Sequence, residues 1–153
     1  MINYEFRAPT GDTAAQLIEL SRCWVEEDCS YGMVINEVSD LSEPLVVALD
    51  AERIIGYCFG HYYQQKKKNS CIEPGAGCFS LDELYVLPEY RSQGIGKTMF
   101  RLMEEAIKNQ CSHLTLATST KNYQAILKLY IEELGMTFHS AFLIKSMEET
   151  AGE

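Results

Sequence analysis

The segment with the clearest chemical pattern is a glycine-rich run that follows a predicted strand in the middle of the chain. The strand is closed by Pro88, and the later run reads Arg91-Ser92-Gln93-Gly94-Ile95-Gly96-Lys97. Proline interrupts strand pairing, and the two glycines leave backbone N–H groups unobstructed at the start of a helix. Such groups bind anions, and the charges of Arg91 and Lys97 add to this preference. The run therefore indicates an anion site, with a pyrophosphate group as its natural ligand.

Two common nucleotide-binding motifs do not fit this run. A P-loop needs a glycine five residues before Gly96, and position 91 holds arginine. A dinucleotide-binding loop needs a small residue at position 99, which is methionine, and it should open the first strand–helix–strand unit of the domain. An ordinary glycine-rich helix start is the alternative interpretation, but the preceding strand and the flanking cations favour a ligand.

The run resembles the coenzyme A loop of the GNAT acetyltransferase superfamily, which reads R/Q-x-x-G-x-G/A after a strand ending in valine, any residue and proline. Arg91, Gly94 and Gly96 match that loop, and the resemblance extends from about residue 54 to residue 138. It implies an N-acetyltransferase with acetyl-CoA as co-substrate, whose pantetheine arm pairs with the strand and whose pyrophosphate binds the loop amides. The cofactor-binding residues implied by the resemblance are Leu84, Tyr85, Val86, Arg91, Ser92, Gln93, Gly94, Ile95, Gly96, Lys97 and Asn122.

The resemblance also implies a general acid on the last predicted helix. This residue would be Tyr130, which would protonate the thiolate of coenzyme A. The superfamily places four steps between this tyrosine and a glycine, whereas Tyr130 lies five residues before Gly135. Either the helix contains a bulge or the tyrosine points elsewhere. Tyr123 is the alternative hydroxyl, and a half-buried structural Tyr130 is a further interpretation.

Amide formation also needs a group that removes a proton from the amine and a donor for the oxyanion. Asp82 and Glu83 lie four and three residues before Val86, where a backbone N–H would serve the oxyanion. Strand periodicity predicts that the two carboxylates lie on opposite faces, so that only one faces the acceptor. Glu83 is the expected catalytic base and Asp82 the alternative, and each could equally be a solvated carboxylate. An acidic pair at these positions also resembles the polyamine acetyltransferases of the superfamily.

No cysteine lies beside an aspartate–histidine pattern, which predicts direct attack by the amine without an acetyl-enzyme. The three histidines are expected to be structural or surface residues. The six cysteines are expected to be reduced thiols, and because no pair has zinc-ligand spacing we assign no metal.

The elements that would position these groups alternate along the chain. Strands are expected at residues 3–9, 45–49, 54–63, 78–87, 113–118 and 138–146. Helices are expected at residues 11–25, 27–38, 94–109 and 123–134. We therefore expect an α/β, GNAT-like single domain over residues 1–153, with a mixed, mostly antiparallel central sheet and helices on both faces.

The composition limits the partners of this domain. A formal net charge of −9 argues against a nucleic-acid partner and fits a cationic substrate. No apolar stretch is long enough to span a membrane, and the amino terminus lacks the features of a secretory signal, so we expect a cytoplasmic protein. The apolar final strand around residues 141–144 could pair with a second copy in a homodimer.

These observations lead to one main hypothesis and two alternatives. The main hypothesis is acetylation of a primary amine on a small cationic metabolite, of the polyamine or amino-sugar type. The alternatives are a protein or peptide N-acetyltransferase and a non-catalytic acyl-CoA-binding module.

Overall fold

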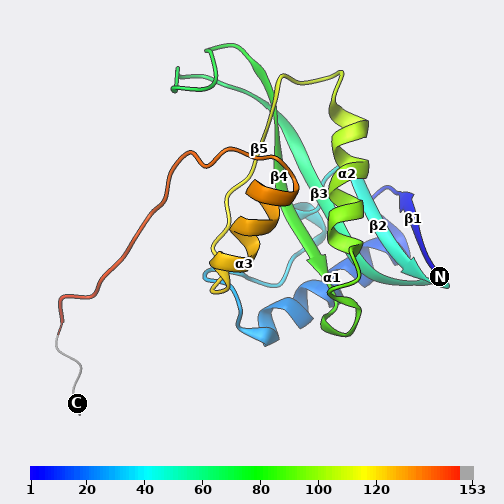
Figure 1. Cartoon of the computed structure of the whole chain (residues 1–153). Coiled ribbons are helices and arrows are strands. Elements are labelled where there is room, and N and C mark those ends of the chain that lie inside the picture. The colour runs from blue at the N-terminus through cyan, green and yellow to red at the C-terminus, as the bar shows by residue number, and fades with distance from the viewer. Residues whose placement is uncertain (149–153) are drawn as a thin grey trace. The chain divides into compact units, whose positions relative to one another are not determined.

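The computed structural model describes residues 1–148, which belong to two compact units. The first unit is Met1–Tyr123, and the second begins at Gln124. The first unit contains one five-stranded sheet (Figure 1). Its strands, in spatial order, are β1 (Ile2–Phe6), β2 (Leu45–Asp50), β3 (Arg53–Gln64), β4 (Gly77–Val86) and β5 (His113–Thr115). The first four strands pair in antiparallel fashion and β5 runs parallel to β4, which confirms the predicted mixed sheet.

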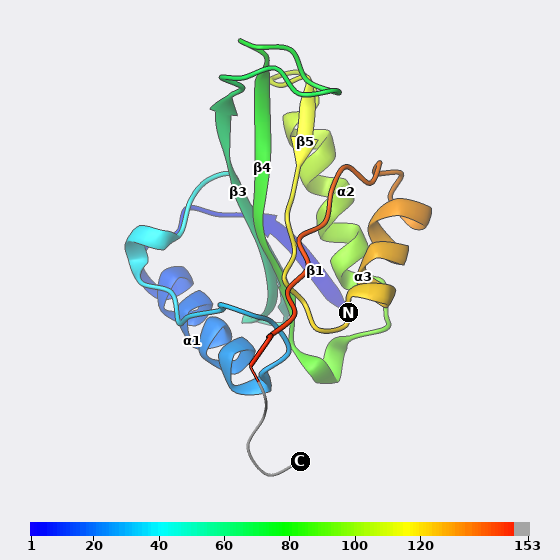
Figure 2. The ribbon, with the colours of Figure 1, turned by 90° about the vertical axis from the view of Figure 1, so that its left-hand side faces the viewer.

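Helices α1 (Gly11–Glu27) and α2 (Ile95–Ile107) lie on opposite faces of this sheet (Figure 2). The buried residues of α2 recur at the spacing of one helix face, which packs on β2, β3 and β4. These residues are Ile95, Met99, Phe100, Met103 and Ile107. The predicted α/β architecture, with helices on both faces of the sheet, is confirmed.

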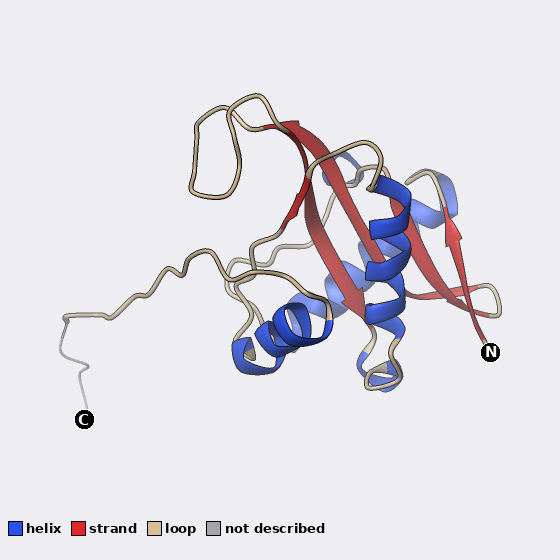
Figure 3. Ribbon diagram, turned by 45° about the horizontal axis from the view of Figure 1, so that its top comes forward, coloured by secondary structure: helices blue, strands red, loops and turns tan. Residues whose placement is uncertain are grey.

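The core of the first unit is centred on β2 and the first half of β3. Residues 45–49 and 54–60 are all buried, and such continuous runs are typical of strands covered on both faces. Beyond the core, β3 and β4 continue outward to a long connecting loop (Figure 3). The sequence therefore predicts these central strands from hydrophobicity alone.

The helix predicted at residues 27–38 is wrong. Helix α1 ends because Asp28 adopts the left-handed conformation, with a φ of 51°. The chain then runs irregularly to a single 3₁₀ turn at Val38–Asp40. In this loop the Tyr31 N–H donates to the carbonyl oxygen of Ser119 at 2.9 Å, so its backbone bonds to a distant segment instead of forming a helix.

Two predicted strands also differ from the structure. The strand predicted at residues 113–118 ends at Thr115, because β4 pairs with β5 only from Cys78 to Ser80. The strand predicted at residues 138–146 is not formed, because the structure has no regular secondary structure over these residues. Phe142 in this segment is 87% exposed.

The helix predicted at residues 123–134 has two parts. It begins as α3 (Tyr123–Lys128) and continues as a π-helical turn at Leu129–Glu133. The Leu134 N–H donates to the carbonyl oxygen of Leu129 at 2.9 Å, which is the five-residue bond of a π-helix. The bulge that the spacing of Tyr130 and Gly135 predicts as one alternative is therefore confirmed.

Candidate active site

The second half of β4 has one open backbone edge. Because β5 leaves β4 after Ser80, only β3 remains paired with β4 along this stretch of the described first unit. The Leu87 N–H donates to the carbonyl oxygen of Ile55 on β3. Backbone groups alternate in direction along a strand, so those of Leu84 and Val86 point to the open edge. This edge can accept an extended ligand as an additional strand.

The glycine-rich run connects this edge to the start of α2, as the sequence predicts. Gly94 precedes the helix in the left-handed region, with a φ of 79° that favours glycine. The first helical bond runs from the Thr98 N–H to the carbonyl oxygen of Gly94 at 3.0 Å. The amides of Ile95 and Gly96 therefore precede the helical ladder and point out of the helix start. This arrangement suits a phosphate group.

Gly96 also brings α2 close to β4. A Cβ atom at this position would lie 3.2 Å from Leu84 Cδ2 and 3.8 Å from Val86 Cγ2. A larger side chain would therefore disturb packing between helix and strand. Asn122, the remaining predicted cofactor residue, is exposed and donates its backbone N–H to Thr120 Oγ1 at 3.2 Å.

Glu83 is a partly buried carboxylate held by three hydrogen bonds. Tyr57 on β3 donates its hydroxyl at 2.8 Å, and the Asn36 amide nitrogen donates to both carboxylate oxygens at 2.9 and 3.0 Å. Burial raises the pKa of Glu83, the bonds from Asn36 and Tyr57 oppose that rise, and the charge of Asp82 adds to it. Burial and the neighbouring Glu83 charge also raise the pKa of Tyr57, which therefore remains a hydrogen-bond donor. When deprotonated, such a carboxylate can accept a proton from a bound ammonium group.

Asp82 lies on the same face of the sheet as Glu83, which corrects the prediction of opposite faces. The register between β3 and β4 shifts at this point, because Phe59 pairs with Glu83 and Gly60 pairs with Leu81. Asp82 is therefore the extra residue of a β-bulge, where strict alternation fails.

The contacts of Asp82 confirm its orientation. One carboxylate oxygen lies 2.6 Å from His61 Nδ1, and the other accepts a hydrogen bond from Ser80 Oγ at 3.0 Å. His61 is four residues after Tyr57, so both side chains project from one face of β3. The bulge thus presents two neighbouring carboxylates to one side of the sheet.

Arg91 is bound to protein groups on all three of its guanidinium nitrogens. Its Nε donates to the carbonyl oxygen of Val86 at 2.8 Å, and the other two nitrogens meet the Glu27 carboxylate at 2.7 and 2.9 Å. The guanidinium also lies 5.4 Å from the centre of the Tyr85 ring. Burial alone would lower the pKa of Arg91, but its hydrogen bonds and attraction to Glu27 raise it. Tyr85 in turn donates its hydroxyl to Glu27 and stacks on Trp24, with ring centres 5.0 Å apart.

Tyr130 belongs to the second unit and lies in its π-helical turn. The residue is 8% exposed. The Met136 N–H donates to its carbonyl oxygen at 2.9 Å, and Gly135 takes a left-handed φ of 74° that ends the helix. The alternative hydroxyl, Tyr123, is 57% exposed.

The sequence matches the Acetyltransferase (GNAT) family over residues 12–136. The chain belongs to this family. It is an acetyl-CoA-dependent N-acetyltransferase. No curated protein gives a significant sequence match.

Solved structures share the fold of this acetyltransferase. An aminoglycoside acetyltransferase from an uncultured soil metagenomic sample, in complex with trehalose, superposes with a TM-score of 0.68 at 15% identity, over 97% of each chain. The aminoglycoside N-acetyltransferase AAC(6')-Iy in complex with CoA gives a TM-score of 0.66 at 14% identity, over 95% of this chain and 94% of that chain. A ribosomal-protein-alanine N-acetyltransferase from Brucella melitensis biovar Abortus 2308 gives a TM-score of 0.65 at 16% identity, over 95% of this chain and 99% of that chain. At these identities the likeness establishes the fold.

Two polar residues around Glu83 are missing from the sequence-based prediction. Asn36 lies in the segment that the sequence assigns to a helix, although its side chain contacts Glu83 47 residues later. Its backbone N–H donates to Ser21 Oγ at 2.9 Å, which fixes the loop against α1. In the sequence, Tyr57 resembles any aromatic residue of a buried strand. Only the hairpin register, which pairs Tyr57 with Tyr85 and Phe59 with Glu83, could have indicated that Tyr57 lies beside Glu83.

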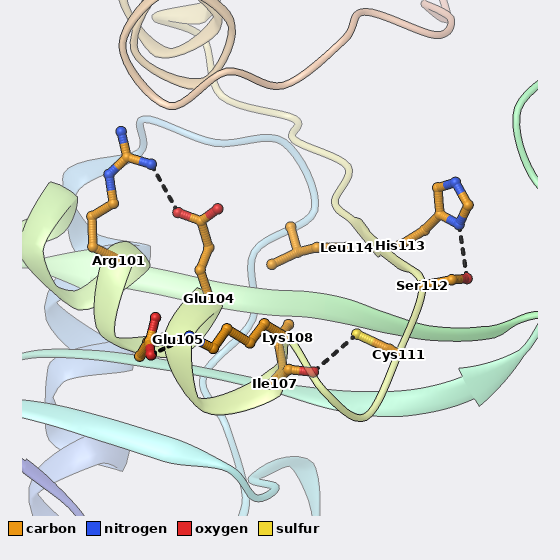
Figure 4. A pocket seen from close by; sticks show the side chains of 9 residues that line it. All are labelled: Arg101, Glu104, Glu105, Ile107, Lys108, Cys111, Ser112, His113 and Leu114. Atoms are coloured by element: carbon orange, nitrogen blue, oxygen red, sulfur yellow. Dashed lines mark hydrogen bonds and ion pairs between the residues drawn. The ribbon is translucent and has the colours of Figure 1, made fainter.

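A separate surface hollow of about 560 Å³ lies between the end of α2 and β5 (Figure 4). None of its lining residues is among the predicted site residues of the acetyltransferase. Two of its charged groups pair with each other along the helix, Arg101 with Glu104 at 3.0 Å. We therefore do not include this hollow in the candidate active site.

Proposed function

We propose that this acetyltransferase moves the acetyl group of acetyl-CoA to a primary amine of a small cationic metabolite, of the polyamine or amino-sugar type. The observation that carries the proposal is the position of Glu83. Its carboxylate lies on the sheet beside the open edge of β4, partly buried and held by Tyr57 and Asn36. A partly buried carboxylate can both attract a cationic amine and accept its proton.

Acetyl-CoA would bind along the open edge of β4 and at the start of α2. The backbone groups of Leu84 and Val86 suit the pantetheine arm, and the amides around Gly94 suit the pyrophosphate. The residues that we assign to this site are Leu84, Tyr85, Val86, Ser92, Gln93, Gly94, Ile95, Gly96, Lys97 and Asn122, with Arg91 beside them. No metal ion is assigned.

The reaction requires three groups of the chain. Glu83 accepts the proton of the ammonium group, directly or through a water molecule, so that a neutral amine can attack the thioester carbon. The Val86 N–H donates to the oxyanion that develops as the carbon–nitrogen bond forms. The nitrogen then loses its remaining extra proton to water, the carbon–sulfur bond breaks, and Tyr130 gives its proton to the departing sulfur. Exchange with water returns Glu83 and Tyr130 to their starting protonation states. The products are the N-acetylated amine and the free thiol of coenzyme A.

Asp82 would serve the acceptor rather than the reacting atoms. Its carboxylate is 31% exposed and lies beside the side chains of His61 and Ser80. Because the bulge places it on the same face as Glu83, it can attract a second positive group of the same acceptor. This arrangement favours acceptors with two cationic groups.

A thiol-release assay with acetyl-CoA and a panel of diamines, amino sugars, monoamines and peptides tests the proposal. We expect the diamines or amino sugars to give the highest kcat/KM. Glu83→Gln should lower that value by about 10²- to 10⁴-fold, which is the usual contribution of a general base. A preference for peptides would identify a protein or peptide acetyltransferase. Binding of acetyl-CoA without any turnover would indicate a non-catalytic module.

We further propose that residues 1–153 form one cytoplasmic acetyltransferase domain that acts as a homodimer. Six free thiols fit a reducing compartment. Within residues 1–148, no helix has the length and apolar character that a membrane crossing requires. The exposed apolar segment with Phe142, Leu143 and Ile144 supports contact with a second copy. Light scattering coupled to gel filtration tests the dimer, which should become a monomer in Phe142→Ser/Ile144→Ser.

A further inference from the structure

We propose that Arg91 is a positioning residue that fixes the backbone at Val86, and that it does not bind the pyrophosphate of acetyl-CoA. The inference rests on the proposed function, because it assumes that acetyl-CoA lies along the open edge of β4. It concerns the first residue of the glycine-rich run, whose charge the sequence assigns to the anion site.

The contacts of Arg91 give every nitrogen of its guanidinium an acceptor within the protein. Its two terminal nitrogens face the two oxygens of Glu27 at 2.7 and 2.9 Å, in the side-by-side geometry of an arginine–carboxylate pair. Its Nε donates to the carbonyl oxygen of Val86 at 2.8 Å. Its flat face covers the Tyr85 ring at 5.4 Å. Glu27 compensates the positive charge, and all three nitrogens already have acceptors.

The bond to Val86 determines what the open edge offers a ligand. Both the N–H and the carbonyl oxygen of Val86 point to that edge, and Arg91 occupies the carbonyl oxygen. The Val86 N–H is then the group of this residue that remains for the ligand. Arg91 therefore orients the backbone beside the reacting carbonyl.

The same cluster connects this backbone to α1. Glu27 is the last residue of α1, and Trp24 of the same helix stacks on Tyr85. Tyr85 donates its hydroxyl to Glu27, so the end of α1, the end of β4 and the start of the loop form one polar and aromatic cluster. Substitution of either Arg91 or Glu27 should loosen Val86 in the same way.

Calorimetric titration of the full chain with acetyl-CoA at several salt concentrations distinguishes the two roles. Arg91→Gln should change the dissociation constant by about threefold or less and leave its salt dependence as in the wild type, because no phosphate contact is lost. Lys97→Gln is the matched control, since it removes one cation from the same run, and it should weaken binding and reduce the salt dependence. This binding measurement needs no acceptor amine.

The second measurement uses Glu27→Gln. A phosphate-binding arginine would be released by this change, so acetyl-CoA should then bind more tightly. A positioning arginine would lose its support, so kcat should fall by about tenfold with either Glu27→Gln or Arg91→Gln while acetyl-CoA affinity persists.

The outcomes separate this inference from the proposed function. If the wild-type protein does not bind acetyl-CoA, the proposed function fails. If it binds, but Arg91→Gln reduces the salt dependence as Lys97→Gln does, or Glu27→Gln tightens binding, then Arg91 is a phosphate ligand and the inference is wrong. A wild-type kcat in a folded Arg91→Gln enzyme would also overturn it.

Discussion

The hydroxyl of Tyr57 donates a hydrogen bond of 2.8 Å to the carboxylate of Glu83 from the neighbouring strand. This bond favours the charged form of Glu83, whereas burial favours the neutral form and raises its pKa above the usual 4.5. The pH at which Glu83, the proposed base, becomes deprotonated therefore depends on a balance between the two effects. A catalytic base works only when deprotonated, so activity should fall as the pH decreases through the raised pKa of Glu83.

Tyr57→Phe should move the acid limb of the kcat/KM profile to higher pH. The change removes a donor that stabilises the carboxylate, so the pKa of Glu83 rises further and a higher pH is needed for deprotonation. Tyr63→Phe is the matched control, because Tyr63 projects from the same face of β3 and its hydroxyl contacts Thr115 Oγ1 at 2.8 Å. An acid limb that stays in place or moves to lower pH would contradict the assignment of Glu83 as the base.

Asp82→Asn should reduce the preference of the enzyme for diamines over monoamines of equal chain length. The substitution keeps the size of the side chain and removes its charge, so only the second cationic group of a diamine loses its partner. We expect kcat/KM for the diamine to fall by about threefold or more, the scale of a partly exposed ion pair, while the value for the monoamine changes little. Glu52→Gln removes a negative charge in the exposed β2–β3 turn. This variant is the control for the change in the overall electrostatic field of the protein. Equal losses for both amines would show that Asp82 does not select the second cation.

Gly94→Ala should weaken acetyl-CoA binding, and Gly75→Ala should not. Both glycines have a positive φ, 79° and 88°, and both have open space where a Cβ would lie. Each substitution should therefore lower the free energy of unfolding by about 1 kcal/mol through backbone strain. Only Gly94 lies at the helix start proposed to hold the pyrophosphate, so only Gly94→Ala should raise the dissociation constant in calorimetry. Equal affinities in the two variants would contradict binding of the pyrophosphate at this loop.

Local patterns were sufficient to predict most of the sheet and the glycine-rich loop before α2. The buried strands β2 and β3 are continuous apolar runs, and the glycines and proline around β4 and α2 mark the loop directly. These features depend on residues close together in the chain. The π-helical turn was also visible in the sequence, as one extra residue between Tyr130 and Gly135.

Features that depend on distant contacts could not be predicted in the same way. The segment with Asn36 has a helical pattern, but its backbone bonds to residues near Ser119. The faces of Asp82 and Glu83 depend on a bulge that only the register with β3 reveals. The apolar residues at 138–146 satisfy the pattern of a strand, but the described chain forms no strand there.

All six cysteines should react with a thiol reagent in denaturing, non-reducing conditions, because each is a free thiol. In the native protein the rates should differ. Cys71 is exposed and should react first, whereas burial raises the pKa of Cys58 to about 12 and should make it slow. Timed alkylation followed by mass spectrometry gives the order, with Cys71→Ser to identify the fast site. Fewer than six reactive thiols in freshly purified, denatured protein would indicate a disulfide.

Tyr130→Phe should lower turnover while acetyl-CoA affinity persists. The substitution removes one hydroxyl and keeps the ring, so packing in the π-helical turn is preserved. General acid catalysis contributes about 10²- to 10⁴-fold, and a loss near the lower end is expected because the thiol of coenzyme A is already acidic. Tyr123→Phe is the matched comparison, since Tyr123 is the exposed alternative hydroxyl and begins α3. If Tyr130→Phe keeps wild-type turnover on a verified acceptor and only the melting temperature changes, Tyr130 has a structural role. A loss of turnover in Tyr123→Phe alone would then identify Tyr123 as the general acid.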